Sequence, residues 1–515
     1  MYERKKNNLK MDVLFISPGN ASGIYQKLSK DYSAIEPPTW ALLLSQSCRS
    51  VGYKVGLIDI NAEKLNKESV IESIKYLNPR LICFVVYGQN VNSGIVNMSG
   101  SVFMSNYIKE VGIKIPICYI GSYVQALPIK SLNDELSIDF VFTNEGVYAL
   151  RNLLSTDLSD LSKIKGIAWR KGDEIIMNHP EKIVPNERMD IDLPGYAWDL
   201  LPFKESPLDL YRAPMWHAEY DQNKRTPYAA IQTSLGCSFT CDFCMVNIIN
   251  RNDNDEIGVA SNYNIIRHWS PEFIISEFEK LIDMKVYTIK ITDELFFSNK
   301  NYFVPLCEMI RDKGYGDKLL MWAYSRIDYL NTNLLKLIRS AGIKWLALGI
   351  ESGSKNVRLD VSKGKFENNY IKKFVNDIHD ADISIMANYI FGLPGDTIES
   401  MKETLDLSIE LNTDDWCGYP AITLPGSKLY KDAILKDIKL PKFYDEFSFH
   451  GYNTLPVETG SLSASDILNF RDNAYDVYHN NPIFLEKIKN KFGQKAVNNI
   501  LEMLEVKLER KILKK

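Results

Sequence analysis

The most informative part of this chain is the nonapeptide Gly236-Cys237-Ser238-Phe239-Thr240-Cys241-Asp242-Phe243-Cys244. It holds three of the eight cysteines within eight residues. A structural zinc ion needs four ligands at close range, yet the next histidine is His268 and the next cysteine is Cys307. A 4Fe-4S cluster held by three thiolates fits better and leaves one iron open to an external ligand. We therefore expect Cys237, Cys241 and Cys244 to bind such a cluster, with zinc or three buried thiols as the alternatives.

The cysteine loop follows the first strand of a repeating αβ pattern that we place at residues 225–430. β-branched and aromatic runs alternate there with helical spacing, which is typical of parallel strands joined by crossover helices. We expect strands at 229–233, 287–291, 320–323, 345–349, 383–391 and 416–422, and helices at 271–284, 303–313, 331–341, 370–381 and 398–411. Six such units indicate a partial (β/α)6 barrel whose strand ends point at one cavity.

Polar or glycine-rich motifs follow the predicted strands of this barrel. Adjacent carboxylates at Asp293 and Glu294 end the second strand, and because neighbouring strand residues face opposite ways, one can face the cavity, where we place the catalytic groups. Arg326 ends the third strand and is a candidate partner for a carboxylate. Glu351 and Ser352 end the fourth, and Gly392 to Gly395 end the fifth with glycines that permit close backbone approach.

Residues 1–154 show a separate βαβ rhythm, typical of a Rossmann-like parallel sheet with helices on both faces. Strands are expected at 12–17, 54–58, 81–86, 117–120 and 140–143. Ligands of such sheets bind beyond the carboxyl ends of the strands, although glycine after a strand is also a common turn. The candidate contacts in these loops are Pro18, Tyr87, Gly88, Gln89, Gly121, Ser122, Asn144, Glu145 and Gly146.

The remaining segments connect and cover these two parts. We interpret residues 155–224 as a linker that contains a hairpin around Lys171 to Asp173. Residues 431–515 are mostly helical in pattern and are expected to cap the barrel. Their aromatic-rich stretch from Tyr430 to Tyr452, which includes Phe449 and His450, is a candidate substrate contact, with core packing as the alternative.

The composition excludes several classes of protein. The 61 basic and 65 acidic side chains leave a net charge of −4, and 45% of the residues are hydrophobic, as in globular enzymes rather than disordered or charge-driven nucleic-acid-binding chains. No apolar run approaches the ~18 residues of a membrane span, and the run at 13–16 is too short for a signal peptide. We therefore expect a cytoplasmic protein.

The cysteine motif resembles the hallmark of the radical S-adenosylmethionine (SAM) superfamily, including the aromatic Phe243 before the last cysteine. The resemblance implies that SAM chelates the open iron and that one electron cleaves it to methionine and a 5′-deoxyadenosyl radical. It further implies that Phe243, Arg326, Glu351, Ser352, Gly392 and Gly395 surround SAM. An external one-electron reductant such as flavodoxin or ferredoxin is implied as a partner.

The order of motifs resembles the subgroup that carries a cobalamin-binding domain ahead of its barrel. Glu36-Pro37-Pro38-Thr39-Trp40, Gly121-Ser122 and Thr143-Asn144-Glu145-Gly146 carry this resemblance in the first domain, although Ser122 and Asn144 stand where the pattern often has glycine. It implies that residues 12–150 bind cobalamin. The first histidine is His179, so no histidine of this domain can be the lower axial ligand of cobalt. Tyr87, Gln89 and Asn90 are candidates there, with loop scaffolding as the alternative.

These features predict a cobalamin-dependent radical SAM methyltransferase acting on an unactivated carbon of a small molecule. A cobalamin-assisted rearrangement, cyclisation or oxidation is the nearest alternative, and a corrinoid or cluster sensor is a more distant one. A methylthiotransferase is disfavoured because the other cysteines are scattered: Cys48, Cys83 and Cys118 lie 35 residues apart. Nucleic acid is not an expected substrate, since no basic domain studded with aromatic residues is present.

Overall fold

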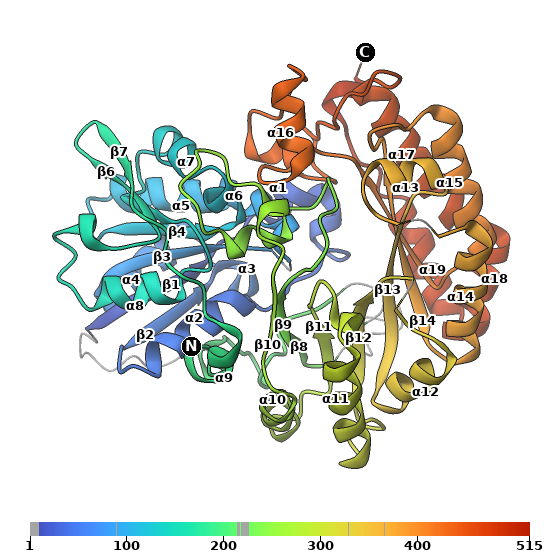
Figure 1. The fold of residues 1–515 in the computed structure, drawn as a ribbon, viewed down its shortest axis with the longest axis horizontal. Helices are drawn as coiled ribbons and strands as arrows, with labels where there is room; N and C mark the ends of the chain where they lie inside the picture. Colours follow the sequence, from blue (N-terminus) through green and yellow to red (C-terminus); the bar gives the residue numbers. More distant parts are fainter. Residues whose placement is uncertain are drawn as a thin grey trace. The chain divides into compact units, whose positions relative to one another are not determined.

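A computed structural model describes residues 10–88, 90–213, 217, 226–327, 329–364 and 366–514. The chain divides into two compact units (Figure 1). Unit 1 contains the described residues of Met1–Asn20, Pro37–Phe203 and Met245–Tyr263, and unit 2 those of Ala21–Glu36, Lys204–Cys244 and Asn264–Lys515. Met245–Tyr263 therefore belongs to unit 1 although the sequence around it builds unit 2, and Ala21–Glu36 belongs to unit 2 although the sequence around it builds unit 1. The predicted boundaries at residues 154, 224 and 430 stay predictions.

Unit 1 is built on a seven-stranded sheet in the order β2-β1-β3-β4-β5-β6-β7. Its strands are β1 Met11–Ser17, β2 Val55–Asp59, β3 Pro79–Val86, β4 Ile117–Gly121, β5 Phe140–Phe142, β6 Ile167–Lys171 and β7 Glu174–Met177. The first five are parallel, as predicted. The predicted hairpin is also confirmed as β6 and β7, and it extends this sheet in antiparallel fashion.

Helices pack along the sheet of unit 1. The crossover helices α2 Thr39–Arg49, α4 Lys67–Leu77 and α5 Met98–Glu110 contact its strands, and α8 Val147–Leu154 packs beside α2. The chain passes from β1 to β2 on one side and then to β3 on the other, so the topological switch lies between β1 and β3. Ligands of such sheets bind at this switch, where the loops after β1 and β3 carry Pro18, Tyr87 and Gly88.

Unit 2 contains a curled, fully parallel sheet of six strands in sequence order, the half-barrel of the predicted (β/α)6 type (Figure 1). The strands are β8 Tyr228–Ile231, β11 Thr288–Ile291, β12 Leu320–Ser325, β13 Ile343–Glu351, β14 Ser384–Phe391 and β15 Asp415–Pro420. The crossover helices are α10 Pro271–Asp283, α11 Lys300–Asp312, α12 Thr332–Ser340, α14 Asn368–Asp380 and α15 Ile398–Leu411. All six strands and five helices predicted from the pattern are confirmed, with ends that differ by a few residues.

The C-terminal part of unit 2 is helical, as expected, in α16 Lys428–Leu435, α17 Ala464–His479, α18 Pro482–Phe492 and α19 Gln494–Leu504. Helix α17 packs against β14 and β15, where Trp416 stacks on Tyr478 with ring centroids 5.5 Å apart. This face of the sheet is therefore core. None of the helices in the described part of the chain combines the length and hydrophobicity that a membrane span requires.

Candidate active site

The three motif cysteines lie in the loop after β9 Ser234–Gly236, a short strand paired with β10 Ile266–His268. Gly236 adopts a φ of +88°, which turns the chain into the loop and favours glycine. The Cys237 Sγ accepts a hydrogen bond from the Phe239 amide at 3.4 Å. The Cys244 amide donates to the Cys241 carbonyl at 3.0 Å, which closes a turn. None of the three cysteines is joined in a disulfide.

This loop fits an iron–sulfur cluster better than a single metal ion. Among the described residues, no three His, Cys, Asp or Glu side chains gather as ligands of one ion do. Cluster ligands are spaced more widely, because each thiolate binds a different iron. Burial raises the pKa of the Cys237 thiol to about 11, so at neutral pH this side chain becomes a thiolate only when a metal cation replaces its proton. Amide donation to Sγ of Cys237 also suits a ligand thiolate.

The two carboxylates after β11 have different surroundings. Asp293 is buried and accepts hydrogen bonds from the Thr233 amide at 2.6 Å, the Thr233 hydroxyl at 2.7 Å and the Ser234 hydroxyl at 2.6 Å. It therefore anchors the strand that leads into the cysteine loop. Glu294 is half-buried, and within the described residues its carboxyl has no hydrogen-bond or ion-pair partner. Burial, and then the charge of Asp293, raises the pKa of Glu294 to about 8.

A buried ion pair lies at the end of β13. The Lys363 ammonium is 2.6 Å from the Glu351 carboxylate, and both side chains are about nine-tenths buried. Burial alone would lower the pKa of Lys363, but Glu351 raises it above its usual value. Gly349 makes room for the pair, because a Cβ there would lie 2.6 Å from Glu351 Oε1 and 2.7 Å from Lys363 Nζ.

The Lys363 loop packs on the cysteine loop. Arg326 donates to the Lys363 carbonyl at 2.6 Å, and its guanidinium lies 3.9 Å from the ring centroid of Phe239. The Asp242 amide donates to the Val361 carbonyl at 3.2 Å, and the Cys241 thiol to the Ser362 carbonyl at 3.8 Å. The structure thus brings Arg326, Glu351 and the cysteine loop together. Ser352, in contrast, is fully buried with its hydroxyl 3.2 Å from that of Thr404 on α15.

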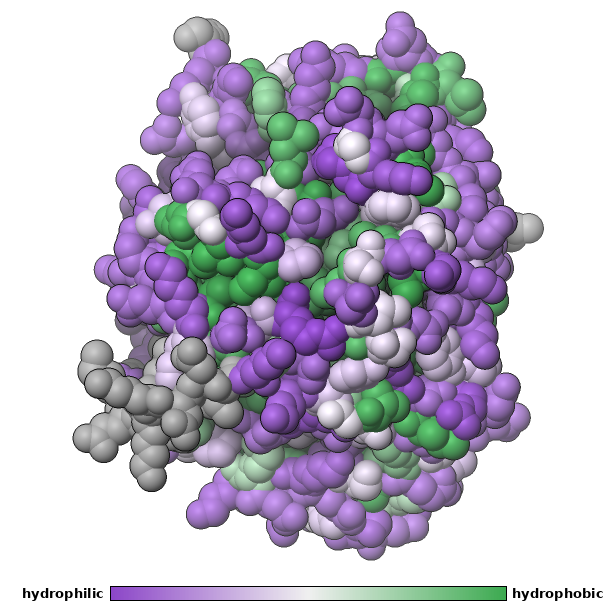
Figure 2. Space-filling model, turned by 90° about the vertical axis from the view of Figure 1, so that its left-hand side faces the viewer, coloured by the Kyte–Doolittle hydropathy of each residue, from purple (hydrophilic) through white to green (hydrophobic). Residues whose placement is uncertain are grey.

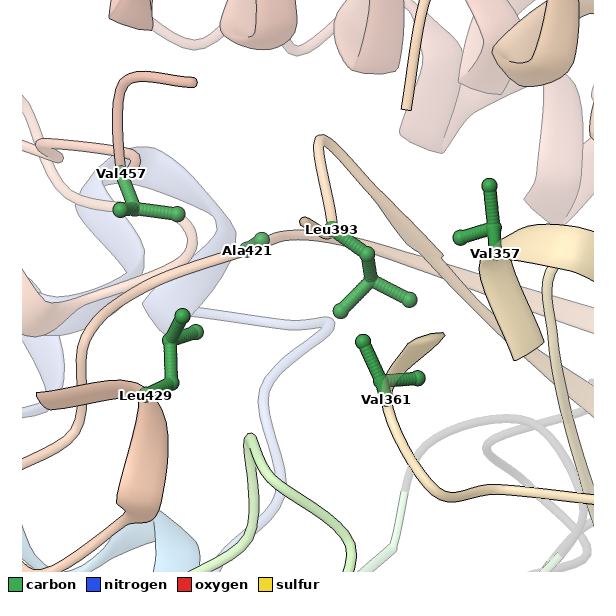
Figure 3. Close-up of a cluster of buried hydrophobic side chains, with 6 residues drawn as sticks. All are labelled: Val357, Val361, Leu393, Ala421, Leu429 and Val457. Carbon is green, nitrogen blue, oxygen red and sulfur yellow. The ribbon is translucent and has the colours of Figure 1, made fainter. Parts of the chain in front are cut away.

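The glycine turn after β14 leads into a hydrophobic cluster. Gly392 and Gly395 both have a φ of +84°, and Asp396 accepts hydrogen bonds at 3.0 Å from the amides of Gly392 and Leu393. Figure 3 shows Leu393 and Val361 pointing toward one another. The cluster consists of Val357, Val361, Leu393, Ala421, Leu429 and Val457, and the partly buried Phe243 packs against it. An apolar surface therefore adjoins the last two cysteines.

In unit 1, glycines allow the loops at the strand ends to pack closely against neighbouring strands. A Cβ on Gly121 would lie 2.2 Å from the Val86 carbonyl oxygen, and one on Gly146, where φ is +78°, would lie 2.5 Å from Ile120. The hydroxyl of Ser122 is buried and has no hydrogen-bond partner among the described residues. The loops thus form a close-packed cradle with an unused polar group in it.

Other predicted side chains of unit 1 are engaged in the loops themselves. Asn144 donates to the Glu181 carbonyl at 2.7 Å and accepts from the Gly146 amide, while Glu145 accepts from the Val184 amide at 2.6 Å. Gln125 donates to the Tyr87 hydroxyl. Pro18 is buried, and Gly88 is half-buried. Gln89 lies outside the described residues.

Sequence reasoning missed Lys363 and Lys290. Lys363 lies in an aperiodic loop twelve residues after Glu351, and nothing in the pattern links the two positions. Lys290 did leave a signal, since a lysine in the middle of the buried strand β11 requires a partner. That partner is Glu36, at 3.0 Å.

Residues 231–408 match the family model of the radical SAM superfamily. An uncharacterized methyltransferase, PH0819 of Pyrococcus horikoshii, is 23% identical over 438 residues, which cover 84% of each chain. The anaerobic magnesium-protoporphyrin IX monomethyl ester cyclase of Cereibacter sphaeroides is 23% identical over 430 residues, which cover 79% of this chain and 62% of the cyclase.

Among solved structures, the fold is similar to that of the radical SAM methyltransferase TsrM from Kitasatospora setae. The structure of TsrM with cobalamin and a 4Fe-4S cluster bound gives a TM-score of 0.63 at 14% identity, over 83% of this chain and 75% of that one. A second TsrM structure, with tryptophan substrate and a SAM analog bound, gives 0.66 at 13% identity, over 97% and 99%. The likeness therefore extends over both units.

Proposed function

Residues 231–408 form a radical SAM domain, and from this premise we propose that the chain is a cobalamin-dependent radical SAM methyltransferase acting on a small molecule. The observation that carries the proposal is the loop of three cysteines, none in a disulfide, beside the buried Glu351–Lys363 pair, in a chain that shares the fold of a cobalamin-binding methyltransferase. An external one-electron reductant of the flavodoxin or ferredoxin type completes the system.

In this proposal, the cluster supplies the electron that cleaves SAM, and cobalamin supplies a carrier for the methyl group. Cys237, Cys241 and Cys244 hold the cluster. Glu351 accepts the ammonium group of SAM, because a buried carboxylate at a strand end beside the cluster loop is a strong acceptor for a cation. The hydrophobic cluster around Leu393, together with Phe243, excludes water from the part of the site where the adenine of SAM binds.

Unit 1 holds cobalamin through its strand-end cradle. Gly121 and Gly146 let the strand-end loops pack closely against Val86 and Ile120 and so fix the shape of the cradle, and the unused hydroxyl of Ser122 offers a hydrogen bond to the ligand. The side chains of Asn144 and Glu145 keep these loops in shape rather than reach the ligand, because both are already hydrogen-bonded within the unit.

The experiment that tests the methyltransferase is a half-reaction that needs no knowledge of the substrate. The reconstituted protein is incubated anaerobically with cobalamin, SAM and titanium(III) citrate, and both S-adenosylhomocysteine and 5′-deoxyadenosine are measured. A methyltransferase forms S-adenosylhomocysteine in proportion to the bound cobalamin. If 5′-deoxyadenosine is the sole product, the reaction is a rearrangement or cyclisation, the second candidate, which the 23% identity to the cyclase favours.

Ionisation of Glu294 should cause the rate of SAM cleavage to fall at alkaline pH. With a pKa of about 8, its carboxyl is mostly protonated at neutral pH and becomes an anion near the cysteine loop as the pH rises through 8. We expect 5′-deoxyadenosine formation to decline above pH 8 in the wild type and to stay level in Glu294→Gln, which is the isostere of the protonated form. Rates across this pH range test it, with Glu308→Gln on the exposed side of α11 as the control. An unchanged decline in Glu294→Gln would assign the titration to another group.

A further inference from the structure

Helix α16 ends in hydrophobic side chains that reach solvent, where an amphipathic helix normally carries polar ones. The helix is held to unit 2 through the buried side chains of Leu429 and Ala433. At its end, Ile434 is 41% exposed and Leu435 is 75% exposed. Phe443, a little further along the chain, is 67% exposed and so is not part of the core. Three large hydrophobic side chains are therefore exposed within ten residues.

The chain reverses direction directly after α16. Asp437 has a φ of +53°, its amide donates to the Ile434 carbonyl at 3.1 Å, and the Ile438 amide donates to the Ala433 carbonyl at 2.9 Å. The side chain of Ile438 packs against the hydrophobic cluster of Figure 3 and holds the turn in place. Leu435 therefore lies at the tip of a hydrogen-bonded turn whose base is packed against unit 2.

This part of the chain is also basic. Residues 428–443 hold five lysines and two aspartates, a net charge of +3, whereas the whole chain carries −4. Lys428 is paired with Asp242 and Asp432. The other four lysines are exposed, and none of them has an ion-pair partner in the part of the chain that the structure describes: Lys431, Lys436, Lys439 and Lys442. We call these four lysines, together with Ile434, Leu435 and Phe443, the α16 patch.

Exposed hydrophobic residues alone do not mark a binding surface. On the face that Figure 2 shows, hydrophobic residues lie in small patches among hydrophilic ones, as on most folded proteins. The α16 patch differs because its hydrophobic side chains stand among lysines that lack ion-pair partners. Within residues 428–443, Asp437 is the one exposed acidic side chain. The patch therefore offers hydrophobic contact and positive charge at the same place.

The composition of the patch indicates what kind of partner covers it. A two-fold contact with a second copy of the chain would place lysines opposite lysines, which repel. A stable protein interface takes about 20 to 30 residues a side and is depleted in lysine, whereas four of the seven residues here are lysines. A membrane surface requires less: a few hydrophobic side chains and a cluster of lysines act as two signals that together give stable attachment.

We propose that the α16 patch binds the surface of a membrane that contains anionic lipids. Ile434, Leu435 and Phe443 enter the boundary between the headgroups and the acyl chains. The four lysines place their ammonium groups at the lipid phosphates, while their alkyl stems lie along the hydrophobic region. The attachment is peripheral. It goes beyond the proposed reaction and does not depend on it, since no residue of the patch belongs to the candidate active site.

The test measures co-sedimentation of the full-length reconstituted protein with two kinds of vesicle. One contains equal parts of phosphatidylglycerol and phosphatidylcholine, and the other contains phosphatidylcholine alone. We expect at least about 100-fold tighter binding to the mixed vesicles, because each lysine at an anionic surface contributes about fivefold. Lys436→Gln/Lys439→Gln should weaken this binding about 25-fold. Leu435→Ala should weaken it about tenfold, since most of a leucine side chain no longer leaves water.

Raising the salt concentration separates the two contributions. Between about 0.1 M and about 1 M ionic strength the Debye length falls from about 10 to about 3 Å, so the attraction of the lysines is screened. Binding of the wild type should therefore weaken at least about tenfold. The double lysine variant should be less sensitive to salt than the wild type, and Leu435→Ala should be as sensitive as the wild type.

Matched controls remove the same groups elsewhere. Leu136 is 80% exposed but stands in unit 1 next to Glu135, so Leu136→Ala should leave vesicle binding unchanged. Lys318→Gln/Lys336→Gln removes two exposed lysines outside the patch and changes the net charge by the same amount as the double lysine variant. It should weaken binding less than about twofold, because charges beyond a Debye length of the membrane are screened.

Equal binding to both kinds of vesicle, no binding to the mixed vesicles, or equal weakening by a control would overturn the inference. Polyglutamate serves as a soluble acidic polymer: if it displaces the protein completely from the mixed vesicles, the patch is a docking site for an acidic protein instead. Melting temperatures identify variants that fail to fold. The half-reaction with cobalamin and SAM is measured on the same preparations without vesicles, and its failure with intact vesicle binding counts against the proposed function alone.

Discussion

Cys241→Ala is expected to prevent assembly of the cluster and to reduce the rate of SAM cleavage by more than about 100-fold. Removing a group that only supports a metal ligand already lowers activity by up to about 100-fold, and this substitution removes a ligand itself. Cys241 is the middle ligand of the loop, and its thiol lies at the Ser362 carbonyl, where the cysteine loop meets the Lys363 loop. Two thiolates cannot replace three, because each binds a separate iron. Iron and sulfide content, visible absorption and 5′-deoxyadenosine formation measure the effect.

The matched control is Cys307→Ala, which removes a thiol of the same unit that lies fully buried on α11, away from the motif. We expect it to retain iron, sulfide and SAM cleavage, at the cost of a small cavity in the core. If Cys241→Ala still assembled a cluster and cleaved SAM, the assignment of the three cysteines would be wrong. Equal loss in Cys307→Ala would instead mean that the measurement reports general damage to the core.

The fold of each unit was largely predictable from hydrophobic pattern. Runs such as 81–86 and 383–391 are apolar, bounded by turn residues, and separated by helical spacing, so the strands and their parallel order followed from local information. The exchange of segments between units was not predictable. Ala21–Glu36 belongs to unit 2, where Glu36 pairs with Lys290, 254 residues later, and no local pattern encodes a contact over that distance.

The candidate site was predicted in part, for a related reason. Strand-end positions such as Arg326 and Glu351 were found because parallel strands bring their carboxyl ends to one edge. The roles of individual side chains depend on contacts that sequence does not show. Asp293 and Glu294 are neighbours with the same chemistry, yet Asp293 is held by three donors and Glu294 by none among the described residues.

Glu351→Gln is expected to weaken SAM binding about 100-fold. The substitution keeps the shape of the side chain but removes the charge that we assign to the ammonium group of SAM, and a hydrogen bond to a buried charge contributes about 2 to 3 kcal/mol. It also leaves the Lys363 ammonium buried without its partner, so the melting temperature should fall as well. Equilibrium dialysis with SAM and thermal unfolding monitored by circular dichroism measure the two effects separately.

The double variant Glu351→Gln/Lys363→Met separates the cofactor contact from the ion pair. Replacing both partners of a buried pair removes the unpaired charge, so the melting temperature should recover toward that of the wild type. SAM affinity should not recover, because the carboxylate is still absent. Lys363→Met alone should keep SAM affinity within about threefold, since the freed Glu351 carboxylate remains available to the ammonium. If the double variant regained SAM affinity together with stability, Glu351 would act only by holding Lys363, and the ammonium of SAM would need another acceptor.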